Sequence, residues 1–190
     1  EMKNLKSITL ALALTLGIAT VSAQTTKKVD AAGSQIVWTG KKVTGEHKGT
    51  INLKEGSLVF KGQKLVGGNF TVDMTTLSTT DLTGEWKDKL DGHLKNEDFF
   101  STAKFPSSKL EFKLIADNGN GNYTVVGDLT IKEIKNSIKF TILVKDNTAT
   151  TSLKIDRTKF DIKYGSGNFF ENLGDKTIAD EFELVVNLKF

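Results

Sequence analysis

Residues 122–145 read NYTVVGDLTIKEIKNSIKFTILVK, and two runs within this stretch alternate largely between apolar and polar side chains. The apolar positions of the two runs are Tyr123, Val125, Leu129 and Ile131, and then Ile138, Phe140, Ile142 and Val144. A period of two places every second side chain on the same face of a strand. The stretch therefore predicts two antiparallel strands, each with one buried face and one face in water.

The same alternation recurs on both sides of this stretch. It covers residues 34–39, 56–61, 69–74, 109–113, 151–155 and 182–190. Turn residues separate the runs: Asp117-Asn118-Gly119-Asn120-Gly121 is a strong hairpin signal, and residues 61–63 and 146–147 are weaker ones. We predict an all-β fold with about eight antiparallel strands. Such a sheet closes into a barrel or packs as a sandwich, and the hairpin order with a helix to cap one end favours the barrel.

Residues 81–100, DLTGEWKDKLDGHLKNEDFF, depart from the period of two. Trp86, Leu90 and Leu94 stand four residues apart, which predicts a short amphipathic helix at about residues 83–94 with Thr83 as its N-cap. Minor helical turns are expected between Asn96 and Pro106 and again over residues 168–173.

The first 23 residues have the pattern of a cleavable signal peptide. A basic segment, Met2 to Lys6, precedes an apolar run from Ile8 to Ala19, and Val21-Ser22-Ala23 offers small residues to a signal peptidase. We predict export, a mature domain over residues 24–190 and no stable membrane insertion after cleavage, because no second such run follows.

Composition excludes several functions. Without cysteine, the chain has no disulfide, thiolate metal site or cysteine nucleophile. A net charge of +3 without a dense basic stripe argues against nucleic acid as a partner. The two histidines, His47 and His93, lack metal-ligand spacing, and no phosphate-binding glycine motif or nucleophile elbow is present. The sequence thus predicts no metal, no cofactor and no enzyme.

Several motifs together resemble the YceI-like family of lipocalin-like periplasmic polyisoprenoid-binding proteins. They are Ser34-Gln35-Ile36-Val37-Trp38, the segment 45–49, His93 to Phe100 followed by Lys104-Phe105-Pro106, Gly127 to Lys132, and Ile155-Asp156-Arg157. The resemblance covers residues 28–190. It implies a periplasmic eight-stranded barrel crossed by a helix, with an elongated apolar tunnel for a prenyl chain or related amphiphile. The family's usual glycine in the turn after LTI is replaced, since the chain has Lys132-Glu133-Ile134, so we expect another turn geometry there.

We therefore predict a non-catalytic protein that holds a polyisoprenoid, an isoprenoid quinone or a fatty-acid-like lipid for transport, storage or sequestration. The ligand-binding residues that we expect are Ile36, Trp38, Phe60, Phe70, Val72, Trp86, Leu90, Leu94, Phe99, Phe100, Phe112, Leu114, Val125, Leu129, Phe140, Ile142, Leu153, Ile155, Tyr164, Phe182 and Leu184. Headgroup candidates are His47, His93 and Arg157, although Asp156-Arg157 also fits a purely structural turn. Alternatives are a filled barrel acting through its surface as a structural or stress-linked partner, and a histidine-dependent hydrolase. A homodimer is left open.

Overall fold

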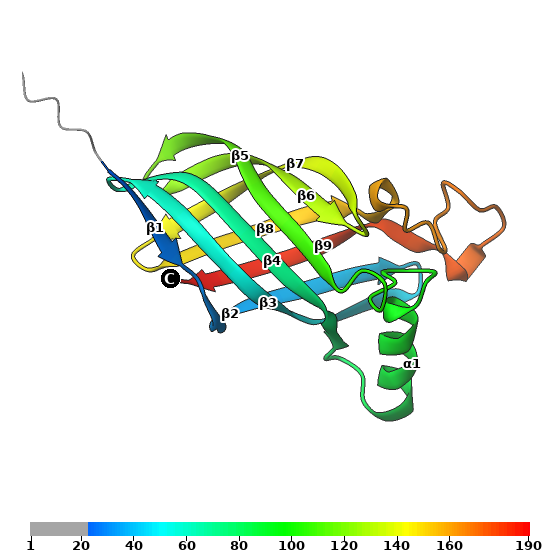
Figure 1. Ribbon diagram of the computed structural model, residues 1–190. Coiled ribbons are helices and arrows are strands. Elements are labelled where there is room, and N and C mark those ends of the chain that lie inside the picture. Colours follow the sequence, from blue (N-terminus) through cyan, green and yellow to red (C-terminus); the bar gives the residue numbers. More distant parts are fainter. Residues whose placement is uncertain (1–22) are drawn as a thin grey trace, which may run out of the picture.

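The computed structural model describes residues 23–190, so the predicted leader, residues 1–23, lies outside its described part except for Ala23. Most of the described chain is strand (Figure 1). The strands are β1 (Gln24–Lys28), β2 (Asp30–Lys42), β3 (Gly45–Lys61), β4 (Lys64–Thr79), β5 (Ser107–Gly119), β6 (Asn122–Ile131), β7 (Ile134–Lys145), β8 (Thr148–Asp156) and β9 (Ile178–Lys189).

Strands β2 to β9 close into an eight-stranded antiparallel barrel. Their order is β3-β2-β9-β8-β7-β6-β5-β4, and β4 pairs again with β3, so no open edge remains between them. The predicted barrel is confirmed. The short strand β1 pairs with residues 57–61 of β3, whereas β2 pairs with residues 45–51 of the same strand. β1 is therefore an extension beside the barrel and not one of its eight strands.

Tight hairpins join the strands from β5 to β8, and their turns lie where the sequence predicts them. Between β6 and β7, however, Lys132 has φ 51° and Glu133 has φ 63°. Both residues are in the left-handed region that a two-residue hairpin turn of the glycine-favouring type requires. The expectation of another geometry at this turn is wrong: the chain keeps the tight turn and places two residues with side chains in it.

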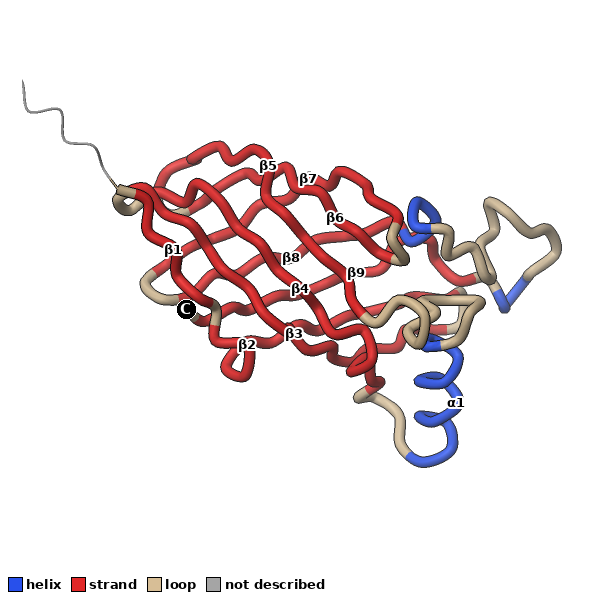
Figure 2. Tube along the Cα trace, in the orientation of Figure 1, coloured by secondary structure: helices blue, strands red, loops and turns tan. Residues whose placement is uncertain are grey.

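The helix α1 (Gly84–Lys95) begins and ends within one residue of the predicted helix. Thr83 occupies the N-cap position, but its side chain makes no capping hydrogen bond. Figure 2 shows α1 at one end of the barrel, together with the loops that follow it and those that precede β9. We call this the helix end; the β3–β4, β5–β6 and β7–β8 hairpins lie at the opposite, hairpin end (Figure 1).

The minor helical elements differ in part from the prediction. Hydrogen-bonded turns follow α1, where the amides of Phe99 and Ser101 donate to the carbonyl of Asn96. Over residues 168–173 there is no helix; a turn at residues 167–169 precedes the 3₁₀-helix η2 (Gly174–Lys176). A second 3₁₀-helix, η1 (Arg157–Phe160), directly follows β8. The glycines at 165, 167 and 174 break the segment into separate short turns.

Candidate ligand-binding cavity

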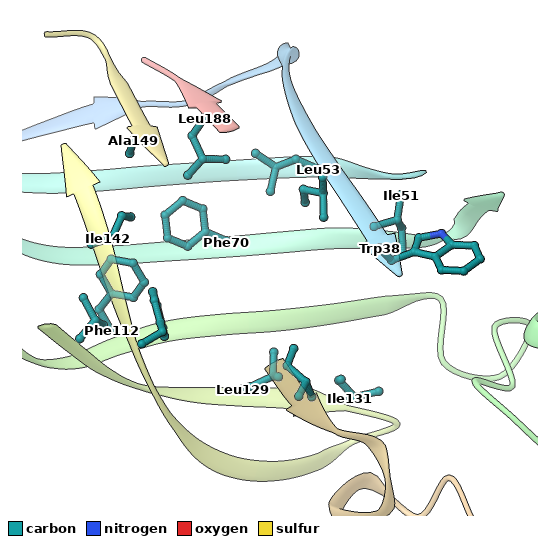
Figure 3. Packing of buried hydrophobic residues seen from close by; sticks show 14 of the residues in the cluster. Trp38, Ile51, Leu53, Phe70, Phe112, Leu129, Ile131, Ile142, Ala149 and Leu188 are labelled. Atoms are coloured by element: carbon teal, nitrogen blue, oxygen red, sulfur yellow. The ribbon is translucent and has the colours of Figure 1, made fainter. Parts of the chain in front are cut away.

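An apolar cavity of about 250 Å³ lies inside the barrel. All eight strands from β2 to β9 contribute inward-facing side chains to its wall, and α1 and the two phenylalanines after it contribute at the helix end. In Figure 3 the labelled side chains of several strands point toward one interior space. Apolar cavities of about 150 Å³ stay dry and accept ligands as large as benzene, so this one has room for part of an alkyl or prenyl chain.

Most of the residues predicted to bind ligand lie on this wall. They are Ile36, Trp38, Phe70, Val72, Leu90, Leu94, Phe99, Phe100, Phe112, Leu129, Phe140, Ile142, Leu153, Ile155, Phe182 and Leu184. The structure also brings the three headgroup candidates, His47, His93 and Arg157, to the same wall. Side chains that are far apart in the sequence thus surround one space because the barrel turns their strand faces inward.

Phe60 and Val125 are buried and point inward but do not line the cavity. Both lie toward the hairpin end. The ring of Phe60 stacks against Phe190 with centroids 5.7 Å apart, and the hydroxyl of Tyr123 accepts a hydrogen bond from the Leu65 amide. The cavity wall still includes Ile142 and Leu188 near that end, so Phe60 and Val125 are core residues beside the cavity.

Leu114 is 67% exposed, so it does not line the cavity. The register between β5 and β6 shifts between Phe112, which pairs with Gly127, and Leu114, which pairs with Val126. This β-bulge reverses the alternation of β5, because it inserts one extra residue into the strand. Beyond it Ile115, and not Leu114, packs against the core.

Trp86 is also outside the cavity, with 71% of its surface exposed. The first turn of α1 projects away from the barrel, and only the second half of the helix reaches the cavity through Leu90, His93 and Leu94 (Figure 1). The indole lies instead beneath the ammonium of Lys89, 5.0 Å from the ring centroid. The spacing of four residues correctly places Trp86, Leu90 and Leu94 on one helix face, but the barrel covers only part of that face.

Tyr164 does not reach the wall either, and it is 46% exposed. Its ring packs edge to face against His93, with centroids 4.6 Å apart. Tyr164 thus supports a wall residue from outside.

His47 is held by a carboxylate at the helix end of the cavity. Its Nδ1 lies 2.9 Å from Oδ2 of Asp81, and Oδ1 of Asp81 accepts a hydrogen bond from the Lys48 amide. Burial would raise the pKa of Asp81, but the hydrogen bonds from His47 and Lys48 outweigh it and lower that pKa. The contact with Asp81 occupies Nδ1 and leaves Nε2 as the remaining polar atom of the imidazole.

His93 faces the cavity from α1 and is enclosed by aromatic rings. It packs edge to face on Phe99, with centroids 5.5 Å apart, as well as on Tyr164. Burial lowers the pKa of His93, and the charge of Asp98 opposes this shift only in part. At neutral pH His93 is therefore a neutral imidazole, which offers a ligand hydrogen bonding without charge.

The guanidinium of Arg157 is buried and donates hydrogen bonds to backbone carbonyls. Nε donates to the carbonyl of Ala179 at 3.0 Å, Nη1 to Ile162 at 2.8 Å and Nη2 to Ile178 at 3.1 Å. Nη2 also lies 3.6 Å from a carboxylate oxygen of Asp180. Burial lowers the pKa of Arg157, and Asp180 opposes this. The structure thus gives Arg157 the structural role, tying η1 to the start of β9, and leaves few donors for a headgroup.

Asp91 fastens α1 to the end of β4. Its carboxylate accepts hydrogen bonds from the amide of Thr79 at 2.7 Å, from the hydroxyl of Ser78 and from the ammonium of Lys87. Burial would raise the pKa of Asp91, but the hydrogen bonds from Lys87 and Thr79 and the charge of Lys87 lower it to about 2. This contact positions Leu90, His93 and Leu94 over the cavity.

Sequence reasoning did not assign several wall residues to the cavity. Apolar ones include Ile51, Leu53, Met74, Leu77, Leu110, Ile131, Ile138, Ile178, Val186 and Leu188. Most of them follow the same alternation that predicts the strands, so the sequence does indicate that they face inward. Two wall residues with hydroxyls, Ser108 and Thr151, carry no such apolar signal.

Residues 23–190 contain neither a cluster of metal-ligand side chains nor a membrane-spanning helix. No group of three or more histidine, cysteine, aspartate or glutamate side chains is placed to hold a metal ion there. None of the helices in that part of the chain is long and apolar enough to cross a membrane.

A family model described as YceI-like domain matches residues 28–190. The chain belongs to the YceI-like family. The resemblance stated from the sequence motifs is thereby confirmed. A curated relative, the UPF0312 protein of Shewanella denitrificans, is 35% identical over 86 residues, which cover 45% of this chain and 43% of that protein. The match thus spans less than half of the length of this relative.

Solved structures share the fold. BcnA of Burkholderia cenocepacia superposes with a TM-score of 0.67 at 21% identity, covering 84% of this chain and 98% of that one. A polyisoprenoid-binding domain from Saccharophagus degradans, implicated in plant cell wall breakdown, gives 0.57 at 13% identity and covers 85% and 97% of the two chains. The YceI protein of Campylobacter jejuni gives 0.55 at 19% identity and covers 74% and 82%. At these identities the likeness establishes the architecture of this YceI-like barrel.

Proposed function

We propose that this protein is a non-catalytic binding protein that holds a long apolar amphiphile in its barrel, for transport, storage or sequestration. A polyisoprenoid, an isoprenoid quinone or a fatty-acid-like lipid is the ligand class. The observation that carries the proposal is the apolar cavity of about 250 Å³ inside a closed barrel. The polyisoprenoid-binding domain of Saccharophagus degradans, which shares the fold, supports the same class of ligand.

The energetics suit such a ligand. Each methylene that moves from water into the cavity contributes about 0.8 kcal/mol, so ten of them contribute about 8 kcal/mol. That is the free energy of a complex with a micromolar dissociation constant, before the cost of association. A wall of aliphatic and aromatic side chains provides this free energy without any directional chemistry.

The two alternatives have less support. A filled barrel that acts only through its surface does not fit an interior cavity of this size. For a histidine-dependent hydrolase, the candidate base is His47, whose one side-chain partner within the described residues is the carboxylate of Asp81. No serine or threonine hydroxyl in that part of the chain hydrogen-bonds either histidine, so no Ser–His or Thr–His pair there supports covalent catalysis.

We further propose that the protein acts in the periplasm, after export and cleavage of residues 1–23. The support is the basic, apolar and small-residue pattern of that segment. A long-chain lipid needs a carrier in an aqueous compartment, which agrees with this location. The lipid is the proposed partner.

The test is to produce the full chain in a bacterium that makes long-chain isoprenoids, purify the protein without detergent, and analyse its organic extract by mass spectrometry. We expect one long-chain lipid at a molar ratio approaching one. Separately, delipidated protein carrying Trp86→Phe would be titrated with a prenyl alcohol, with Trp38 on the cavity wall as the fluorescent reporter. An extract without lipid together with unchanged Trp38 emission would refute the proposal.

A further inference from the structure

One hydroxyl on the cavity wall has no hydrogen-bond partner. Ser108 is 7% exposed and lines the cavity, and its Oγ makes no hydrogen bond within the described residues. Buried hydroxyls are almost always paired, because an unpaired one has lost its water without replacement. A buried polar atom left free at a binding site therefore points to a function in binding.

The strand geometry directs Ser108 into the cavity. It is the second residue of β5, and Leu110 and Phe112, which follow at intervals of two, also line the cavity. Across the sheet it pairs with Val72 of β4, another wall residue. Since side chains on one strand face repeat every second residue, the hydroxyl shares the inward face with these apolar side chains. The β-bulge of β5 comes only after Phe112, so it does not disturb this phase.

The other hydroxyl of the wall provides a contrast. Oγ1 of Thr151 donates to the carbonyl of Thr141 at 2.6 Å, so it is already satisfied by the barrel. The remaining buried side-chain atoms without partners, Thr79 Oγ1 and Asp180 Oδ1, belong to residues that do not line the cavity. Ser108 is therefore the wall hydroxyl of the described chain that is free to bond a ligand.

The position of Ser108 along the barrel axis also determines which part of a ligand it could hydrogen-bond. β5 starts at the helix end, and Phe112 lies four residues further toward the hairpin end, about 13 Å along the strand. A tail that packs against Phe112 would thus place its polar head, or a polar group close to the head, near Ser108.

We propose that Ser108 hydrogen-bonds a neutral oxygen of the bound amphiphile, such as a hydroxyl or a carbonyl. This inference rests on the proposed function and names the headgroup class. A charged head is disfavoured at this depth because an ionised group among carbon side chains needs a partner of opposite charge. Of the cations on the wall, Arg157 is buried and already bonds three carbonyls and faces Asp180, whereas Lys41, Lys42 and Lys109 are exposed.

The test compares two ligands with one carbon skeleton, farnesol and the hydrocarbon β-farnesene. Both would be titrated into Trp86→Phe protein with and without Ser108→Ala, with Trp38 emission as the signal. We expect Ser108→Ala to weaken farnesol binding about tenfold, or about 1.4 kcal/mol, and to leave farnesene binding within about twofold. Thr151→Val is the matched control: it removes the satisfied hydroxyl and should leave the ratio of the two affinities unchanged.

Unfolding in urea accompanies the titrations. Ser108→Ala should be at least as stable as its parent, because it removes a buried hydroxyl that has no partner. Equal losses for farnesol and farnesene, no loss for either, or a stability loss that accounts for the weaker binding would overturn the role of Ser108. If neither ligand binds the parent protein, the proposed function fails as well.

Discussion

Filling part of the cavity from the wall should block the ligand without harming the fold. Val186 lies on β9 between Ile36 of β2 and Thr151 of β8, and all three line the cavity. Val186→Phe adds about four carbons to that space. If the ring displaces about four buried methylenes of the ligand, the binding free energy falls by about 3 kcal/mol, and the dissociation constant becomes roughly 200-fold larger. The free energy of unfolding should change by less than about 1 kcal/mol, because the ring enters existing space.

The matched control is Val125→Phe. Val125 is fully buried but does not line the cavity, so the same four carbons enter packed core. Overpacking of this kind costs about 1–3 kcal/mol. Urea unfolding of the two variants, with farnesol titration of Trp38 fluorescence in the Trp86→Phe background, measures both effects. The reasoning is refuted if Val186→Phe is destabilised as much as Val125→Phe, or if it binds the lipid as tightly as its parent.

Two further predictions concern the frame around the cavity. Glu133→Gly should raise the free energy of unfolding by about 0.5–1 kcal/mol, because glycine adopts the left-handed φ of this turn without strain. An unchanged or lower urea midpoint would contradict this. Gly121→Ala is the control with the opposite expected sign, because its added Cβ would meet the Val144 carbonyl and destabilise the turn. Asp91→Asn should cost about 2 kcal/mol at pH 7, since the pKa of Asp91 lies near 2 in the folded protein and near 3.8 in the unfolded chain. Because a depressed carboxyl pKa stabilises above the unfolded pKa and stops doing so as the pH falls through the folded one, the gap between parent and variant should close between about pH 4 and pH 2. A gap that is the same at every pH in urea unfolding would show that the charge of Asp91 is not its source.

The strands could be predicted because burial on one face leaves a direct mark on the sequence. Runs such as those around Phe140 and Leu129 alternate without interruption, and the helix of residues 84–95 departs from that period over its whole length. Closure was harder to foresee. It depends on β3 pairing with both β2 and β4, and a strand that pairs on two sides has the same alternation as one that pairs on one side.

The errors at Leu114 and Trp86 have a common cause. Each residue has the right spacing for the buried face, and each lies outside the cavity because of a feature that spacing does not encode. For Leu114 this feature is a one-residue bulge against β6; for Trp86 it is the point at which the helix extends past the barrel. Both depend on tertiary contacts, which a single sequence does not contain.

The limits of the cavity follow from volume and not from pattern. Val125 and Phe140 pair across β6 and β7 and both face inward, yet only Phe140 lines the cavity. Toward the hairpin end, the ring of Phe60 packs on that of Phe190, and the Tyr123 hydroxyl accepts a hydrogen bond from the Leu65 amide. Whether a barrel interior is filled depends on side chains from all of its strands at one height, so the strand pattern predicts where the interior is but not how much of it is hollow.

The helix end shows why affinity in this barrel should depend on buried chain length more than on charge. Two of the polar groups that approach the cavity there already have partners in the protein: His47 bonds Asp81, and Arg157 bonds three carbonyls and faces Asp180. His93 is kept neutral by burial among aromatic rings. An ionic head that approached His47 or Arg157 would therefore have to displace one of these contacts to gain a new one. The free energy left for binding comes from the tail against the apolar wall, with Ser108 as the free hydroxyl that orients the head.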